Sequence, residues 1–326
     1  MNTCNVLSLL LTIDKYSITH NIMLLCTKII ILILTMPALP ELTPHIYPWL
    51  FLSITIIVAF VKPVLWPISF IVTVFSALVF NAINFIGLGI ITLLFLLTFY
   101  AQKPSLSKWH LRVKKSTSII VIISCVALAA HVVPGFNNLL VIDGLEKNIN
   151  SVPFSMYLNF DKPMILFTLL LLSPTILLHE KPVYLLRINT SYRLLAFIML
   201  SFIVIFSLGI ALSLISFTPQ MPNWWAWFAI NNLLLTCVVE EVFFRGFIQR
   251  KLSQFFKPII CLIIASCLFG MAHFSGGFSY VIVATVAGFL YGFVYLNTGK
   301  LWHVILIHFG LNMTHLYLFT YPLLKS

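Results

Sequence analysis

Two carboxylates and one arginine interrupt an otherwise apolar stretch of the chain, residues 238–246 (VVEEVFFRG). If this stretch spans a membrane, each charge near the bilayer centre costs on the order of 3 kcal/mol, so such groups face a protein interior or a water-filled cavity. On a helix, Glu241 and Arg245 are four residues apart and can form an ion pair, whereas Glu240 points about 100° away. A packing ion pair therefore explains Glu241 and Arg245 but leaves Glu240 without a partner.

Three further polar groups fall in later apolar segments. His273 ends the apolar segment 269–273, a position typical of packed or interfacial histidines. His308, Asn312 and His315 follow at spacings of four and three, which places them in one stripe on a helix. Hydrogen bonding between neighbouring helices is the alternative explanation for such a stripe.

Glu240, His273, His308 and Asn312 together supply a carboxylate, two imidazoles and an amide. These groups can activate water by general-base catalysis and stabilise an oxyanion, which is what amide hydrolysis requires. No serine or cysteine nucleophile is obvious. Glu240 with His273 and His308 could instead bind a divalent metal such as zinc, although the HExxH helix of common zinc proteases is absent.

The composition shows what must position these groups. The chain has 326 residues, of which 61% are hydrophobic and 8% are charged. Soluble domains contain about a quarter charged residues, so this composition indicates a membrane protein and excludes disorder, a coiled coil and a separate soluble catalytic domain. The net charge of +11 comes mainly from basic residues in short connections, where they set membrane orientation, so nucleic acid is not implied as a partner.

Eleven apolar runs predict an all-α fold, a polytopic bundle of about 9 to 11 transmembrane helices. The lower count applies if the first two runs form one distorted hairpin, because Lys28, Pro37 and Pro40 interrupt them. The runs are 23–36, 48–61, 64–80, 83–100, 118–133, 163–178, 194–217, 224–244, 258–274, 280–296 and 301–319.

The distribution of basic residues predicts the orientation. If all eleven runs alternate, 15 of the 19 basic residues lie on one side, three (Lys147, Lys162 and Lys325) lie on the other, and Arg245 stays inside a run. Because Lys and Arg are enriched on the cytoplasmic side, we expect a cytoplasmic amino terminus and an outer carboxyl terminus. In a bacterium this would be a multi-pass protein of the inner membrane. The longest outer connection, 134–162, is expected to be a loop.

Three motifs in order resemble the CPBP family of CAAX prenyl endopeptidases and bacteriocin-processing proteins, also called the Abi family. They are E-E-x-x-x-R-G at 240–246, F-x-x-x-H at 269–273 and H-x-x-x-N at 308–312. The segment 288–299 (GFLYGFVYLNTG) is also similar to the part of the family that precedes its last motif. The resemblance covers about residues 223–318.

This resemblance implies an all-helical intramembrane endopeptidase whose site lies in a chamber open to membrane and water. At the matching positions, Glu240 would be the general base and His273 would help to hold the attacking water. His308 and Asn312 would stabilise the oxyanion.

Glu241 and Arg245 would support the base. Family members are often labelled metalloproteases, but the glutamate-water mechanism needs no metal, and we favour it; the expected cofactor is therefore none, with zinc as the alternative. The expected partners are the bilayer and a membrane-associated or lipid-modified peptide or protein. Residues 1–193 would form amino-terminal transmembrane helices without an assigned function, and residues 194–326 would form the catalytic core.

Two other classes of protein would carry similar residues. A proton-coupled transporter could use Glu240 and the histidines as a relay, although paired repeats with broken helices are absent from the sequence. A non-catalytic immunity or scaffold membrane protein of the same fold could keep the motifs for packing. Substrate, cleavage site and oligomeric state do not follow from the sequence.

Overall fold

The computed structural model describes residues 44–104, 107–183 and 191–325. The chain divides into two compact units, one up to Phe85 and one from Ile86 onward, and each is described by itself. The predicted apolar run 23–36 lies outside the described residues.

In the first unit, two apolar helices form a hairpin. α3 (Tyr47–Val61) and α4 (Trp66–Val79) are joined by a short 3₁₀ turn that begins at Pro63. Hydroxyl groups connect the two helices, because the Thr55 Oγ1 atom lies 2.8 Å from Thr73 Oγ1 and 2.6 Å from Ser69 Oγ. These contacts satisfy the polar groups inside an apolar helix pair.

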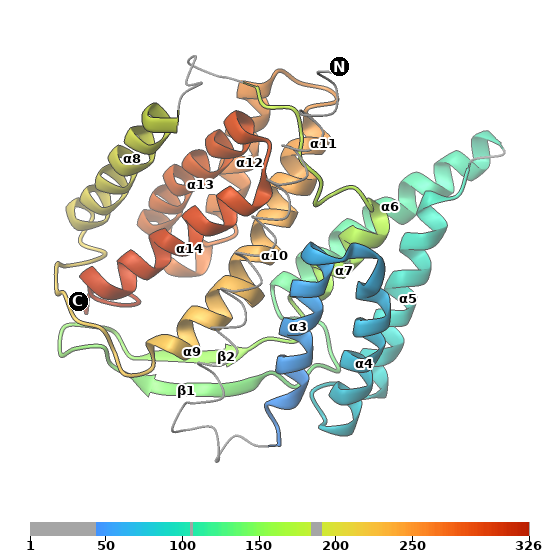
Figure 1. The fold of residues 1–326 in the computed structure, drawn as a ribbon, viewed down its shortest axis with the longest axis horizontal. Helices are drawn as coiled ribbons and strands as arrows, with labels where there is room; N and C mark the ends of the chain where they lie inside the picture. Colours follow the sequence, from blue (N-terminus) through green and yellow to red (C-terminus); the bar gives the residue numbers. More distant parts are fainter. Residues whose placement is uncertain (1–43, 105–106, 184–190, 326) are drawn as a thin grey trace, which may run out of the picture. The chain divides into compact units, whose positions relative to one another are not determined.

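The second unit is mainly helical and holds all the candidate site residues (Figure 1). Its first part contains α5 (Phe85–Gln102), α6 (Lys108–Ala129), β1 (Leu139–Leu145), β2 (Phe154–Leu158) and α7 (Met164–Leu172). Its second part contains α8 (Ser191–Ala211), a long composite helix from Trp225 to Leu252, α12 (Pro258–Met271), α13 (Phe278–Thr298) and α14 (Leu301–Leu318).

Among the residues that the structure describes, four helices are long and apolar enough to cross a membrane: Phe85–Gln102, Tyr192–Ala211, Trp225–Leu252 and Phe278–Thr298. The protein is therefore a helical integral membrane protein, as predicted. The predicted count of 9 to 11 spans is not established by these four helices.

Two predictions for the connection before α7 and for α7 itself are wrong. Residues 134–162 do not form a loop alone but contain an antiparallel β-hairpin in which Leu139 pairs with Leu158, so the fold is not purely α. The predicted run 163–178 yields a helix of only nine residues, because Pro174 follows its end at Leu172 and cannot continue a helix.

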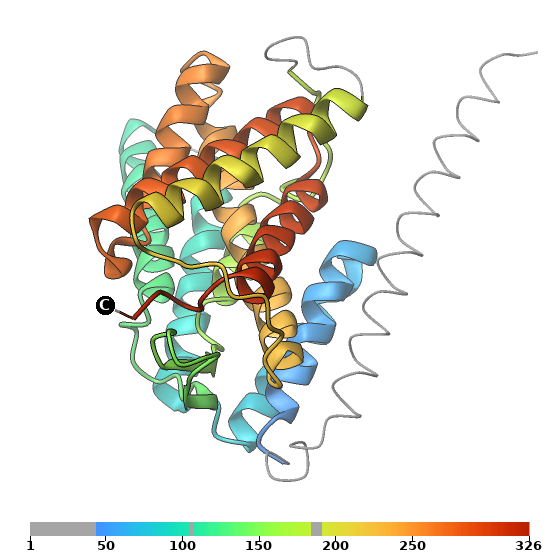
Figure 2. The ribbon, with the colours of Figure 1, turned by 90° about the vertical axis from the view of Figure 1, so that its left-hand side faces the viewer.

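The carboxyl-terminal residues 319–325 run beside the connection 212–221, as Figure 2 shows. The Thr320 N–H donates to the Ser216 carbonyl at 2.9 Å, and the Leu324 N–H donates to the Leu214 carbonyl at 2.7 Å. Lys147 reaches this junction from the hairpin. It is buried, and it donates to three backbone carbonyls, those of residues 218, 317 and 319. Lys147 therefore acts as a structural link between segments.

α12 and α13 pack closely because α12 has a glycine at the contact (Figure 1). A Cβ atom at Gly270 would overlap the Thr285 hydroxyl and lie 2.8 Å from the Val281 carbonyl oxygen. By contrast, a Cβ atom at Gly310 of α14 would meet nothing within 4 Å. α13 ends at Thr298 and is followed by Gly299, which has a φ of +64°, a left-handed conformation that favours glycine.

Candidate active site

The site is organised by the long helix Trp225–Leu252, which has 28 residues. Over the 18-residue stretch that would cross a membrane, 89% of this helix is buried inside the protein. It therefore lies among other helices and continues beyond the predicted end of the run at residue 244. Its successive parts are α9 (Trp225–Ile230), a π-helical segment (Asn231–Cys237), α10 (Val238–Glu241), a second π-helical segment (Val242–Gln249) and α11 (Arg250–Leu252).

The alternation of π and α turns keeps residues four apart in straight rows. In a regular α-helix such residues drift around the axis by about 40° at each step. The wider π turns, with i→i+5 hydrogen bonds, offset this drift. As a result Asn232, Thr236 and Glu240 all line one cavity.

A second row of residues on the same long helix, also four apart, faces other helices. Arg245 and Gln249 are buried and donate to the carbonyl oxygens of Gly288 (2.9 Å) and Gly292 (3.1 Å) on α13. Arg245 Nη1 also lies 3.2 Å from Glu241 Oε2, and both side chains have zero exposure. This contact confirms the predicted ion pair.

Aromatic rings surround the buried arginine. The Arg245 guanidinium carbon lies 4.6 Å from the ring centre of Phe269, 5.4 Å from that of Tyr291 and 5.7 Å from that of Phe244. Ring faces attract cations, and the rings exclude water from the pair. Arg245 is thus held from several sides and has little freedom to move.

Glu240 does have a partner, contrary to the expectation that it stands alone. Its Oε1 atom lies 2.7 Å from the ammonium of Lys162, which precedes α7. No hydrogen-bond partner for its Oε2 atom exists among the described residues, and this atom lies 3.9 Å from His308 Nε2. Spacing along one helix gives no sign of this partner, because Lys162 is 78 residues away in the chain.

His308 links the two carboxylates. Its Nδ1 atom lies 2.7 Å from Glu241 Oε1, while its Nε2 atom faces Glu240. The Tyr291 ring stacks on the imidazole at 4.5 Å between centres. A carboxylate at Nδ1 fixes the orientation of the ring and favours a proton on that nitrogen.

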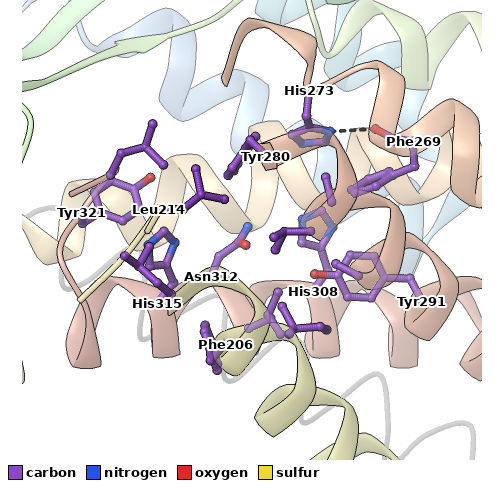
Figure 3. A pocket seen from close by; sticks show the side chains of 18 of the residues that line it. Phe206, Leu214, Phe269, His273, Tyr280, Tyr291, His308, Asn312, His315 and Tyr321 are labelled. Carbon is purple, nitrogen blue, oxygen red and sulfur yellow. Dashed lines mark hydrogen bonds between the residues drawn. The ribbon is translucent and has the colours of Figure 1, made fainter. Parts of the chain in front are cut away.

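His273 reaches the same cavity from just beyond the end of α12 (Figure 3). Its Nδ1 atom lies 2.8 Å from the Phe269 carbonyl oxygen, which acts as the acceptor. The Nε2 atom is thereby left as the nitrogen able to accept a hydrogen bond. The predicted contribution of a third helix to the cavity is therefore seen in the structure.

The polar stripe on α14 lines this cavity as well (Figure 3). Asn312 Nδ2 donates to Asn232 Oδ1 at 3.2 Å. His315 Nε2 lies 3.1 Å from the Thr320 carbonyl oxygen. Asn232 was missed by sequence reasoning, although an Asn-Asn pair at 231–232 inside an apolar segment was a usable signal.

Two cavities meet at Glu240, His273 and Tyr280. The first, of about 200 Å³, also contains His308 and Asn312. The second, of about 630 Å³, is lined mainly by apolar side chains: Ile122, Val126, Ile165, Val239, Phe243, Phe244, Ile248, Leu268 and Met271. The site thus has a polar chamber beside a larger apolar one. Tyr280 lies in no motif, so no sequence signal pointed to it.

The arrangement of the donor atoms bears on the metal alternative. Among the residues that the structure describes, no group of three or more His, Cys, Asp or Glu side chains is arranged to hold a metal ion. The Lys162 ammonium on Glu240 also repels a cation at that carboxylate. These residues, as arranged, do not fit a metal site.

The fold and the site define a class: a helical integral membrane protein with a buried carboxylate, imidazole and amide chamber. Residues 222–314 match the family model described as type II CAAX prenyl endopeptidase Rce1-like. The match confirms the resemblance to the CPBP family and spans all six candidate residues, Glu240, Glu241, Arg245, His273, His308 and Asn312. No curated protein and no solved structure matches the chain.

Proposed function

We propose that the protein is an intramembrane endopeptidase that hydrolyses a peptide bond of a membrane-associated or lipid-modified peptide or protein. The observation that carries the proposal is the junction of the two cavities at Glu240 and His273. The polar cavity supplies groups for water activation, and the apolar cavity offers space for an apolar side chain or lipid chain. The family match to CAAX-type endopeptidases agrees with this chemistry.

In the proposed reaction, Glu240 takes a proton from water and the resulting hydroxide adds to the scissile carbonyl carbon. Glu240 Oε2 and His308 Nε2 are 3.9 Å apart, too far for a good hydrogen bond but close enough for one water to bridge them. His273, which lines both cavities, helps to hold this water. The proton then passes to the leaving nitrogen as the carbon–nitrogen bond breaks.

The oxyanion that forms in this step is stabilised by His308 and Asn312. The Asn312 amide is a neutral donor, and His308 can donate from Nε2 while its Nδ1 donates to Glu241 only when both ring nitrogens carry protons. Glu241, 2.7 Å from His308 Nδ1, offsets the positive charge that this state carries. Arg245 in turn holds Glu241 in place.

The same proposal includes the membrane arrangement. We propose 9 to 11 spans, a cytoplasmic amino terminus and an outer carboxyl terminus, with the catalytic core in residues 194–326. The basic-residue distribution supports this orientation, and the location of the whole matched segment within residues 194–326 supports the core. The mechanism that we propose uses no cofactor.

The test is a comparison of the termini of membrane peptides in cells that carry wild-type protein or the Glu240→Gln variant. Glu240→Gln removes the base with little change in shape, so we expect specific termini to vanish. Glu146→Gln is the matched control, because the same change is made at an exposed ion pair with Lys325. If Glu240→Gln gives the same termini as wild type, the protease proposal is wrong, and a scaffold role gains support.

A further inference from the structure

Lys162 reaches the site from a part of the chain outside the family match. It lies between the end of β2 and the start of α7, and residues 222–314 are the matched segment. Its ammonium lies 2.7 Å from Glu240 Oε1, and the two side chains are only 15% and 13% exposed. An ion pair this sheltered is screened much less by salt than a surface pair.

The backbone of Lys162 is held in place by its neighbour Asp161, which is buried. Asp161 Oδ2 lies 2.8 Å from His131 Nδ1. Its Oδ1 atom accepts from Asn138 Nδ2 at 3.3 Å and from the Lys162 backbone N–H at 2.8 Å. The position of the lysine is therefore set by contacts to the segment before the hairpin, and not by Glu240 alone.

In the resting site, in which both histidines are neutral, the charges balance only when Lys162 is counted. Glu240 and Glu241 carry two negative charges, and Arg245 carries one positive charge that is taken up by Glu241. With neutral histidines, the site without Lys162 would keep one uncompensated negative charge inside the protein. Such a charge is costly, and a carboxylate in this situation binds a proton.

We propose that Lys162 is the counter-charge that keeps the Glu240 carboxylate ionised near neutral pH, and so able to accept a proton from water. The proposal deepens the endopeptidase function and rests on it. Lys162 acts through Glu240 and is therefore a positioning residue rather than a catalytic one. The amino-terminal part of the chain, which has no assigned function, thus supplies a charge to the site.

No other described group replaces this cation. The remaining titratable or charged groups around Glu240 are Cys237, Glu241 and Arg245 on its own helix, His273 after α12, Tyr280 and Tyr291 on α13 and His308 on α14. Arg245 is committed to Glu241, and the uncharged groups supply no positive charge. His273 and His308 supply one only when they are protonated.

The first test reads the protonation of Glu240 without a substrate. Dicyclohexylcarbodiimide modifies protonated carboxyl groups in apolar surroundings, and fragment masses distinguish Glu240 from Glu241. In full-length protein in lipid nanodiscs, we expect the pH below which Glu240 is modified to rise by about 1 to 3 units in Lys162→Met, the usual effect of losing a close opposite charge. Lys162→Arg should behave as wild type, and so should Lys325→Met, which removes an exposed lysine. An unchanged pH dependence in Lys162→Met overturns the proposal.

The second test uses the substrate that the comparison of termini identifies. In Lys162→Met, the acid limb of the pH–rate profile should shift to higher pH by about 1 to 3 pH units, as in the labelling test. Activity that is lost near pH 7 should therefore return at higher pH. A purely structural role would lower the rate equally at all pH values and would overturn the proposal. Faster cleavage by Lys162→Met would also overturn it, because the ion pair would then be inhibitory.

A failure to fold is informative as well. If Lys162→Met does not fold but the double variant Lys162→Met/Glu240→Gln does, the cation is needed only when the carboxylate is present, which supports the proposal. If neither folds, the lysine has another structural role and the proposal is wrong. Cleavage by Glu240→Gln would refute the endopeptidase mechanism, whereas an inactive Glu240→Gln with wild-type labelling in Lys162→Met would refute this inference alone.

Discussion

Two arginine–glutamate pairs in this protein allow a direct comparison of buried and exposed ion pairs. Arg245 lies 3.2 Å from Glu241 with both side chains fully buried. Arg250 lies 2.6 Å from Glu180, with side chains 29% and 38% exposed. The shorter pair is the exposed one, so distance and burial predict opposite rankings of their importance. We expect burial to decide.

The expected magnitudes follow from these environments. Arg245→Met keeps most of the aliphatic volume but leaves Glu241 buried with only His308 beside it, and breaking such a pair typically costs about 3 to 5 kcal/mol. Arg250→Met breaks a solvent-screened pair that is worth about 0 to 1 kcal/mol. At about 2 °C per kcal/mol, the melting temperature should fall by about 6 to 10 °C for Arg245→Met and by at most about 2 °C for Arg250→Met.

The assay is thermal unfolding of purified protein in one detergent, followed by intrinsic tryptophan fluorescence. The double variant Glu241→Gln/Arg245→Met should recover part of the loss, because it removes the stranded charge and keeps an acceptor for His308. Equal shifts for Arg245→Met and Arg250→Met, or no recovery in the double variant, would refute the reasoning.

Four other predictions concern the site and the fold. Asn312→Ala should slow cleavage by about 10²- to 10³-fold through loss of an oxyanion donor. A metal-free site predicts no stoichiometric zinc by elemental analysis and no inhibition by chelators. One zinc per chain would contradict the metal-free mechanism. Gly270→Ala should destabilise the protein by about 1 to 3 kcal/mol because a methyl group would overlap α13, whereas Gly310→Ala, in open space, should be neutral or slightly stabilising in the same melting assay. A cysteine at exposed Asn150 should react with an impermeant maleimide in intact cells and one at exposed Ser107 should not; the reverse pattern would overturn the predicted orientation.

Local spacing was enough to predict the contacts that lie within one helix. The Glu241–Arg245 pair follows from a separation of four residues, and the stripe of His308 and Asn312 follows from the same period. In an apolar chain every ionisable group stands out, so few candidates had to be considered. The convergence of three helices on Glu240 could be inferred only from the chemistry that the groups share.

Contacts between distant segments could not be predicted in this way. Lys162 has the same sequence context as a lysine that sets membrane orientation, so its pairing with Glu240 had no local signal. The hairpin could have been predicted from the sequence, because its strands (LLVIDGL and FSMYL) are rich in β-branched, aromatic and other apolar residues. Pro174 also indicates a helix that ends earlier than the predicted run 163–178.

The π-helical segments on either side of Glu240 have a consequence for how this protein tolerates changes of chain length. A π turn contains one residue more than an α turn, so each π segment contains one residue more than a regular α-helix of the same number of turns. Deleting one residue within 231–237 would let that segment become α-helical while Glu240 keeps its direction. The same deletion within the short α segment 238–241 would turn the carboxylate by about 100°. Natural length variation in this helix should therefore fall in the π segments and spare the four residues between them.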